Sequence, residues 1–450
     1  MKNRVKMGLA FGLIIVLNAC QGNDTNDVNK DATVLRYANW NLGTEEENNL
    51  ERQMIQAYEA ANPDVKIEID ESITGDWMEA LATAASAGNL PDVFMLSDTV
   101  TSYANQWLLD LSDLAMADEE FNHLPLAVQN ATKLNGSVYA IPFAQFMMGY
   151  YINKDLFNQL NLSAPVYGLN VEELVTAIRD TTDLNQPFVG VNSIDQFIDW
   201  YPGVVNSNLG WFTFTDGRYH LDSEEMLQGM RLASELGRND YTYVGLTDEQ
   251  QKLFTGENDA DAFRAGQMAM FYNGSWMNND FAQNADFQWD FIGIPGERSA
   301  LTLDQVGIAK TAEHPEIAYD FAKWMSYGKE GYLERLEIVV NQGVEINALP
   351  VTSDVDLLNR YWEIVDVPGI REAYENLDNA MIDGNKIVPG YIASRWEGNT
   401  GVQVEDIDNA NIGDIFWHSV YGTINYQDYG SQVNVLAQQY YDEAVSAMAP

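Results

Sequence analysis

The chain has 450 residues and carries 67 acidic side chains against 24 lysines and arginines, a formal net charge of −43 at pH 7. A field of this sign repels polyanions, so the composition argues against a nucleic-acid partner or an anionic substrate. Aromatic residues make up 12% of the sequence, and the 11 tryptophans and 23 tyrosines favour positions with one apolar and one wet side. The length is sufficient for two domains with sizeable cores.

The N-terminal residues have the pattern of an export signal. Three of the first six residues are basic, and residues 7–17 form an apolar run shorter than the roughly 20 residues that span a membrane. The run ends in the sequence LNAC, which resembles the lipobox of bacterial lipoproteins. The resemblance implies a signal peptide at 1–19, an acylated Cys20 that starts a polar tether to residue 30, and an extracytoplasmic protein anchored to the cell membrane. The alternative is an ordinary signal peptide with a chance cysteine.

The next hundred residues alternate between strand and helix patterns. Thr44 and Glu47 have the spacing of a capping box, which predicts that a helix begins at Thr44, and Asp76 is placed to cap a second helix. Alternating or continuous apolar residues predict strands at 33–38, 65–69 and 92–96. A β-α-β-α-β order favours a mostly parallel sheet covered by helices.

The rest of the chain continues in the same α/β manner. Asn135-Gly136 predicts a tight turn between two strands. Further strands are expected at 147–152, 190–193 and 268–272, and helices at 155–160, 222–236 and 259–265, from Ser275 and from Pro315. The last third is expected to be mostly helical.

Several kinds of catalytic or cofactor site have no counterpart in the sequence. No glycine-rich phosphate loop with a lysine is present, and no Gly-x-Ser-x-Gly elbow. The four histidines are scattered without ligand spacing, and the single cysteine leaves no thiolate set for zinc or copper. We therefore expect no cofactor, no metal and no catalysis, and binding is favoured over enzymatic activity.

Four segments together resemble the carbohydrate-binding subfamily of ABC-transporter substrate-binding proteins, which includes the maltodextrin-binding proteins. They are NLPDVFMLSD at 89–98, GSVYAIPF at 136–143 leading into GYYINKDLF at 149–157, AFRAGQMAM at 262–270 followed by NGSW at 273–276, and AYDFAKWM at 318–325. The third segment is the most specific, and the order and spacing of the four carry the resemblance.

The resemblance implies a periplasmic-binding-protein type II fold, with two α/β lobes, a hinge and a ligand cleft between the lobes. Carried onto this chain, the first lobe would hold residues 31–141 plus 295–350 and the second 142–294 plus 351–450. The implied function is a monomeric solute-binding lipoprotein that captures an oligosaccharide and delivers it to the permease subunits of an ABC importer.

The resemblance and the positions of polar and aromatic side chains give a set of candidate ligand contacts. Asp98 matches a hydroxyl-binding carboxylate of the family, and Trp276 matches an aromatic platform. Gln145 and Phe146 lie where the family's chain enters the second lobe. Other family contact regions correspond to Phe197, Asp199, Trp200, Arg395 and Trp396, and Trp211 is a further candidate nearby. Trp40, Glu46 and Asp304 are candidates from position alone.

Three other functions remain open at this point. The net charge could steer a polyamine or another cation to an importer of the same kind. A secreted glycoside hydrolase needs only two carboxylates, and 67 acidic residues supply many chance pairs. A surface adhesin would hold glycans without transport.

Overall fold

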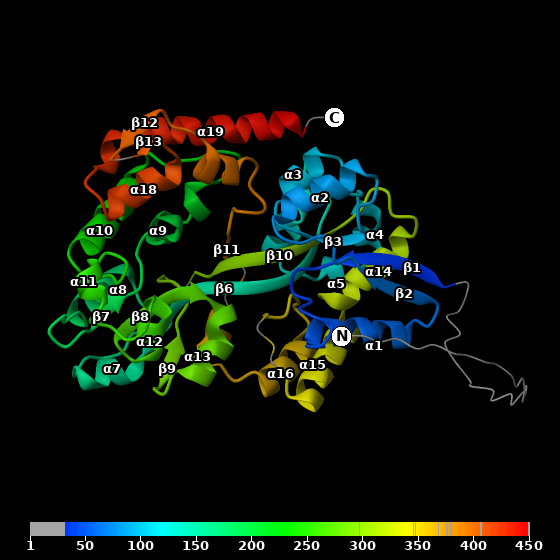
Figure 1. Ribbon diagram of the computed structural model, residues 1–450, viewed down its shortest axis with the longest axis horizontal. Helices are drawn as coiled ribbons and strands as arrows, with labels where there is room; N and C mark the ends of the chain where they lie inside the picture. The colour runs from blue at the N-terminus through cyan, green and yellow to red at the C-terminus, as the bar shows by residue number, and fades with distance from the viewer. Residues whose placement is uncertain are drawn as a thin grey trace, which may run out of the picture.

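The computed structural model describes residues 32–448 except for 297, 345, 347, 368, 375, 376, 378, 379 and 406 (Figure 1). The predicted signal peptide, Cys20 and the tether lie outside the described residues. Within the described ranges, none of the helices combines the length and the apolar character that crossing a membrane requires.

One mixed sheet runs through the molecule, with strands in the order β2-β1-β3-β10-β6-β8-β7. β9 adds to β6, and β11 adds to β10. The strands are β1 (Thr33–Ala38), β2 (Val65–Ile69), β3 (Val93–Leu96), β6 (Ile141–Asn153), β7 (Val189–Val191), β8 (Met268–Gly274), β9 (Trp289–Phe291), β10 (Ala300–Ile308) and β11 (Met381–Ile382). The first three strands are parallel, as predicted, but β10 and β6 are antiparallel to their neighbours on the main path, so the sheet is mixed.

β6 and β10 are the longest strands, and they cross the centre of the molecule from one group of helices to the other (Figure 1). Helices α1 (Leu50–Ala61), α14 (Pro315–Met325), α15 (Lys329–Gln342) and α16 (Val355–Ile364) lie on the side of β1 and β2. The same end of the sheet carries α2 (Trp77–Ser86), α3 (Thr99–Ala104), α4 (Ser112–Ala117) and α5 (Glu119–Asn122). We call this the β2 end of the molecule.

The opposite end, which we call the β7 end, surrounds β7 and β8. Its helices are α7 (Lys154–Gln159), α8 (Val171–Asp180), α9 (Phe197–Val205), α10 (Glu224–Arg238), α11 (Asp248–Gln251), α12 (Asp259–Arg264), α13 (Asn278–Asn284), α18 (Ile412–Val420) and α19 (Gly430–Ala447). The remaining elements are α6 (Leu126–Ala131), α17 (Ile370–Tyr374), a π-helical turn (Ala393–Glu397), 3-10 turns at Trp211–Thr213, Ser275–Met277 and Tyr426–Asp428, and the hairpins β4 (Lys133–Leu134)–β5 (Ser137–Val138) and β12 (Val402–Val404)–β13 (Ile407–Ala410).

Two large apolar cores lie against the sheet. Tyr151 of β6 belongs to the core that also contains Phe321 of α14, whereas its neighbours Tyr150 and Ile152 belong to the core that contains Phe416 of α18. Successive side chains of a strand point to opposite faces, so β6 separates the two cores.

The predicted strands 33–38 and 65–69 are confirmed residue for residue.

The predicted start of the first helix was wrong by six residues. The capping bonds form, from the Thr44 amide to Glu47 Oε2 at 2.7 Å and from the Glu47 amide to Thr44 Oγ1 at 3.3 Å. However, Asn48 has φ of 39°, which interrupts helical geometry. The helix begins only at Leu50, with Asn49 as its N-cap. The predicted cap of the second helix, Asp76, is confirmed.

The last helix connects the two ends of the sheet. Val433 and Ala437 of α19 are buried in the core at the β7 end. Met448, just after the helix, packs with Val100 and Leu134 at the β2 end. Figure 1 shows α19 running across the top of the molecule toward α3.

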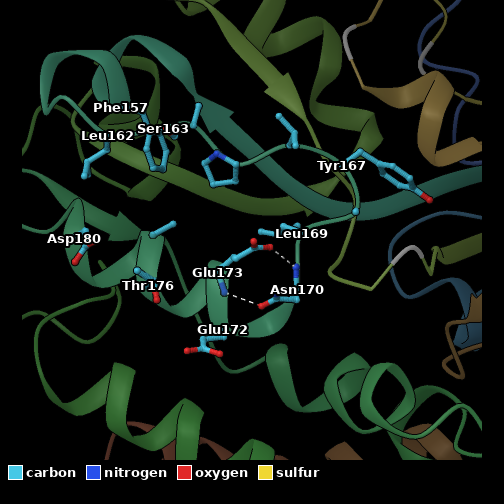
Figure 2. Close-up of a pocket in the computed structure, with 15 residues that line it drawn as sticks. Phe157, Leu162, Ser163, Tyr167, Leu169, Asn170, Glu172, Glu173, Thr176 and Asp180 are labelled. Carbon is cyan, nitrogen blue, oxygen red and sulfur yellow. Dashed lines mark hydrogen bonds between the residues drawn. The ribbon is translucent and has the colours of Figure 1, made fainter.

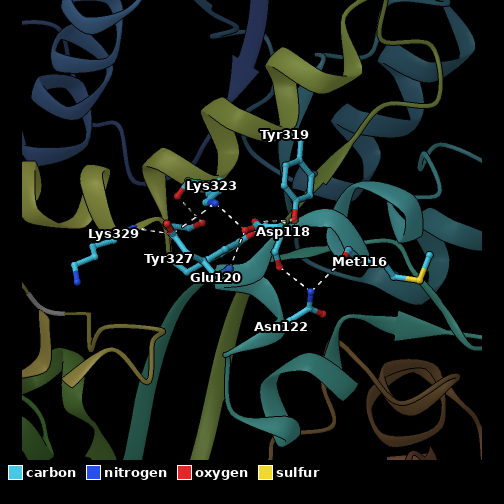
Figure 3. Close-up of polar contacts among 9 residues, drawn as sticks. Met116, Asp118, Glu120, Asn122, Tyr319, Lys323, Tyr327 and Lys329 are labelled. Carbon is cyan, nitrogen blue, oxygen red and sulfur yellow. Dashed lines mark hydrogen bonds and ion pairs between the residues drawn. The ribbon is translucent and has the colours of Figure 1, made fainter. Parts of the chain in front are cut away.

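A polar network at the β2 end joins the segment around α5 to α14 and α15 (Figure 3). Asp118, the N-cap of α5, accepts hydrogen bonds from Tyr327 Oη at 2.7 Å, Tyr319 Oη at 3.2 Å and Lys323 Nζ at 2.7 Å. Burial raises the pKa of the Asp118 carboxyl, but the hydrogen bonds from Lys323 and Tyr327 outweigh burial and hold the pKa below 3.8. The network therefore stabilises the fold with an ionised carboxylate.

Candidate functional site

One face of β6 and β10 forms the floor of the candidate site. Phe146 on β6 lies opposite Thr302 on β10, and Asp304 follows two positions along the strand, on the same face. Leu301 and Met147 point to the other face, where both are buried in the core that contains Phe321 of α14. The floor therefore carries an aromatic ring, a hydroxyl and a carboxylate side by side.

Asp304 sits at an irregularity of the strand pairing. The register between β10 and β6 shifts between Asp304 and Gln305, where Asp304 pairs with Ala144 and Gln305 with Pro142. Bulges of this kind bend a strand and redirect a side chain, and they are frequent beside functional sites.

A turn over residues 383–387 covers part of the floor. The Asp383 amide donates to the Leu301 carbonyl at 2.8 Å, and the Asp383 carboxylate accepts from Thr302 Oγ1 at 3.3 Å. Lys386, in the same turn, forms an ion pair with Asp304. The two paired side chains are only 19% and 12% exposed, so the pair is largely shielded from water.

Two partly exposed tryptophans flank the floor. Trp40, which follows β1, is 37% exposed, meets Trp77 edge-on at 5.2 Å between ring centroids, and has Lys386 Nζ 5.4 Å from its ring centroid. Trp276, which follows β8, is 38% exposed and meets Phe146 edge-on at 5.5 Å. One tryptophan comes from each end of the sheet, and contacts through the floor residues connect them.

A third exposed tryptophan is held by a buried arginine. Arg395 binds Asp199 with both terminal nitrogens, at 2.7 and 3.1 Å, and donates to Tyr391 Oη at 2.5 Å. The guanidinium carbon lies 4.8 Å from the ring centroid of Trp396, which is 51% exposed, and 4.6 Å from that of Phe212. Burial raises the pKa of Asp199 to about 6, although the charge of Arg395 opposes the rise.

The other residues singled out in the sequence have structural contacts of their own. Gln145 points to the opposite face of β6 and donates to the Pro350 carbonyl at 2.6 Å. Asp98 is the N-cap of α3, where it accepts from the Thr101 amide at 2.9 Å and from Thr101 Oγ1 at 2.6 Å. Three aromatic residues are buried in the core at the β7 end: Phe197, Trp200 and Trp211.

Glu46 lines a cavity of about 790 Å³ next to Trp40. Its walls include Trp40, Trp77 and Asp70. A second pocket of about 790 Å³ is formed by residues 162–170 and one side of α8 (Figure 2). The second pocket shares no residue with the floor or with Trp40, Trp276 and Trp396, so we do not include it in the candidate site. In the described part of the chain, no group of three histidine, cysteine or carboxylate side chains is placed to hold a metal ion.

The sequence alone did not single out several residues of this cluster: Trp77, Thr302, Asp383 and Lys386. Trp77 lies in the first turn of the helix capped by Asp76. Thr302 belongs to β10, whose alternation of apolar and polar residues was a usable signal for a strand. The turn DGNK at 383–386 is a recognisable loop sequence, but nothing in it indicates the residue that it approaches.

The comparisons with known proteins agree with this fold. A model of the bacterial extracellular solute-binding protein family matches residues 53–389. The multiple sugar-binding protein of Streptococcus mutans is 24% identical over 349 residues, covering 72% of this chain and 79% of the relative. A solved substrate-binding protein from Listeria monocytogenes, in complex with cycloalternan, superposes with a TM-score of 0.68 at 21% identity over 91% of this chain and 99% of that structure. The cyclic α-maltosyl-1,6-maltose binding protein of Arthrobacter globiformis gives a TM-score of 0.67 at 16% identity, with coverages of 92% and 100%.

These structures share the maltose-binding type of periplasmic-binding-protein fold, which confirms the fold class predicted from the sequence. The matched residues include strands from both ends of the sheet and both central strands. They also include the floor, Trp276, and the residues Trp77 and Lys386 that contact Trp40. The chain therefore belongs to the family of bacterial extracellular solute-binding proteins.

Proposed function

We propose that this protein is the solute-binding component of an ABC importer and that it captures an oligosaccharide on the floor between Trp40 and Trp276. The observation that carries the proposal is the cluster itself, in which two partly exposed tryptophan rings flank a strand face bearing Asp304 and Thr302. The relatives named for multiple sugars and cyclic glucans support the same class of ligand.

The chemistry of a sugar matches this arrangement. A pyranose ring presents flat C–H faces, which pack on aromatic rings, and a rim of hydroxyls, which hydrogen-bond carboxylates and amides. Micromolar binding needs about −8 kcal/mol, and each hydrogen bond contributes only about 0.5–1.5 kcal/mol net. Several aromatic and polar groups must therefore act together. Trp396 is a third candidate platform, in addition to the two tryptophans that flank the floor.

We place the division into two lobes along the central strands. The β2 end with its helices would be one lobe and the β7 end the other, with β6 and β10 as hinge strands. α16 packs directly on α15, with the ring centroids of Tyr361 and Tyr332 6.5 Å apart, so we assign α16 to the first lobe. Ligand binding between the lobes would draw them together.

Export and anchoring complete the proposed function. The signal-like residues 1–19 and Cys20 fit a lipoprotein held at the outer face of the cell membrane, from which a monomer would pass its ligand to the permease subunits. A Cys20→Ser variant expressed in the native host would then incorporate no labelled fatty acid, in contrast to the wild type. Equal incorporation by this variant would remove the lipid anchor from the proposal.

The experiment that tests the ligand class is a thermal-shift screen of residues 21–450 against neutral oligosaccharides, with polyamines alongside. A ligand at about 100 times its Kd adds roughly 2.7 kcal/mol to the free energy of unfolding, which raises the melting temperature measurably. We expect a shift with one glycan class and a smaller shift for Trp276→Ala. A shift with polyamines alone would replace the sugar by a cation.

Catalysis is tested on the same protein. We expect the bound glycan to remain intact after prolonged incubation, because the chain belongs to a family of solute-binding proteins. Release of shorter sugars, measured by chromatography, would identify a glycoside hydrolase instead.

A further inference from the structure

Lys386 occupies a defined position above the floor of the candidate site. Its turn is fixed by the pairing of β11 with β10 and by Asp383, which accepts hydrogen bonds from the Asn385 amide at 2.9 Å and from Asn385 Nδ2 at 2.8 Å. The Lys386 ammonium pairs with Asp304 and lies 5.4 Å from the Trp40 ring centroid. One side chain thus contacts both a carboxylate of the floor and an exposed tryptophan.

A lysine side chain offers the same two features as a sugar ring. Its methylene groups are apolar and pack on aromatic rings, and its ammonium donates hydrogen bonds. Trp40 accepts the first kind of contact, and the Asp304 carboxylate accepts the second. A glycan that stacks on Trp40 and donates a hydroxyl to Asp304 would need both groups that Lys386 now contacts.

We propose that Lys386 is an internal placeholder that the ligand displaces. This inference rests on the proposed function and adds a determinant of affinity and selectivity to it. Without ligand, Lys386 keeps the shielded Asp304 carboxylate paired, which avoids an uncompensated charge. A ligand must replace both contacts to compensate for the displacement, so a glycan that reaches only Trp40 or only Asp304 is rejected.

The test measures Kd by titration calorimetry for the glycan that gives the largest thermal shift with the wild-type protein. Lys386→Ala removes the competing contacts, and we expect binding about three- to tenfold tighter than wild type. Lys386→Met keeps the apolar stem but removes the ammonium, so it should fall between the two. Lys310→Ala is the matched control, because Lys310 contacts Gln106 at 3.4 Å and no residue of the floor, and its Kd should equal that of the wild type.

A double variant separates displacement from a general change in charge. If Lys386 competes for the Trp40 ring, the gain from Lys386→Ala shrinks in a Trp40→Ala background, whereas an effect of net charge persists in full. Circular dichroism and melting temperature establish that each variant is folded.

The outcomes distinguish this inference from the proposed function. Unchanged or weaker binding by both Lys386 variants, with tight binding by wild type and weakened binding by Trp276→Ala, would overturn the placeholder and leave the proposed function standing. A full gain in the Trp40→Ala background would also overturn it. Absence of glycan binding by wild type and by both Lys386 variants would overturn the proposed function and the placeholder together.

Discussion

Gly274 determines where the Trp276 ring can lie, and this gives a sharp test of the proposed platform. The glycine ends β8 with φ of −86° and ψ of 160°, a conformation that alanine adopts without strain. A Cβ added there would lie 2.2 Å from Cζ3 of Trp276, and the three nearest atoms all belong to that ring. Carbon atoms in contact are about 3.5–4.0 Å apart, so in Gly274→Ala the ring must move by roughly 1.3 Å or more.

The effect on binding follows from the exposed area of the ring. Trp276 is 38% exposed, which corresponds to about 95 Å² if a whole tryptophan offers about 250 Å². At about 25 cal/mol per Å², a glycan that covers half to all of this area gains about 1.2–2.4 kcal/mol. Displacing the ring should therefore weaken Kd roughly 7- to 50-fold, similar to Trp276→Ala.

The assay compares Gly274→Ala in two backgrounds by calorimetry and thermal unfolding. In the wild-type background we expect weaker binding and a lower melting temperature, because the ring leaves Phe146. In the Trp276→Ala background the clash is gone, so binding should not weaken further. Stability should instead rise by about 0.4–1 kcal/mol through the lower entropy of the unfolded chain. Equal effects in both backgrounds would refute the account of Gly274.

Two further predictions concern stability. Asp118→Asn should lower the free energy of unfolding by about 2–4 kcal/mol at neutral pH, measured in urea. Because the pKa of Asp118 is lower in the folded protein, the stability that its carboxylate contributes is present above the unfolded pKa and is lost as pH falls through the folded pKa. The unfolding free energies of wild type and variant should therefore converge in acid. A difference that stays constant with pH would contradict this dependence on the Asp118 carboxylate. Arg395→Met leaves the buried Asp199 carboxylate unpaired and should lower the free energy of unfolding by about 3–5 kcal/mol. The double variant Arg395→Met with Asp199→Leu should regain most of this loss. An equal loss in the double variant would argue against a stabilising buried ion pair.

Local signals in the sequence predicted much of the fold at the β2 end. The strands β1 and β2 and the Asp76 cap depend on alternation and on hydrogen bonds between residues close in sequence, which a local pattern contains. β10 was not predicted, although its residues 301–304 alternate between apolar and polar, and β6 was predicted at half its length. The pairing of the two strands is set by contacts between distant segments. The pairing of the two strands that carry the floor is therefore not contained in any local pattern.

The candidate site shows the same limit. Trp200 and Trp276 are the same residue type in aromatic stretches, yet Trp200 is buried in a core and Trp276 is partly exposed, because tertiary packing decides which ring keeps a free face. Lys386 approaches Asp304 across 82 positions of the chain, through the pairing of β11 with β10. No periodicity in either segment encodes such a contact.

The paired course of β6 and β10 has a mechanical consequence. Movement of one end of the sheet relative to the other would bend this antiparallel ribbon, in which the backbones of the two strands pair along most of β10. A two-stranded ribbon can bend elastically while its inter-strand hydrogen bonds stay formed, so movement of the two ends would need no local unfolding of the ribbon. The Met147 amide donates to Ser275 Oγ and the Leu301 carbonyl accepts from Asp383, both outside the ribbon, so the ladder bonds alternate onto the neighbouring pair Phe146 and Thr302. The amides of Phe146 and Thr302 should accordingly be among the slowest to exchange with solvent, even if the two ends of the sheet move relative to one another as proposed.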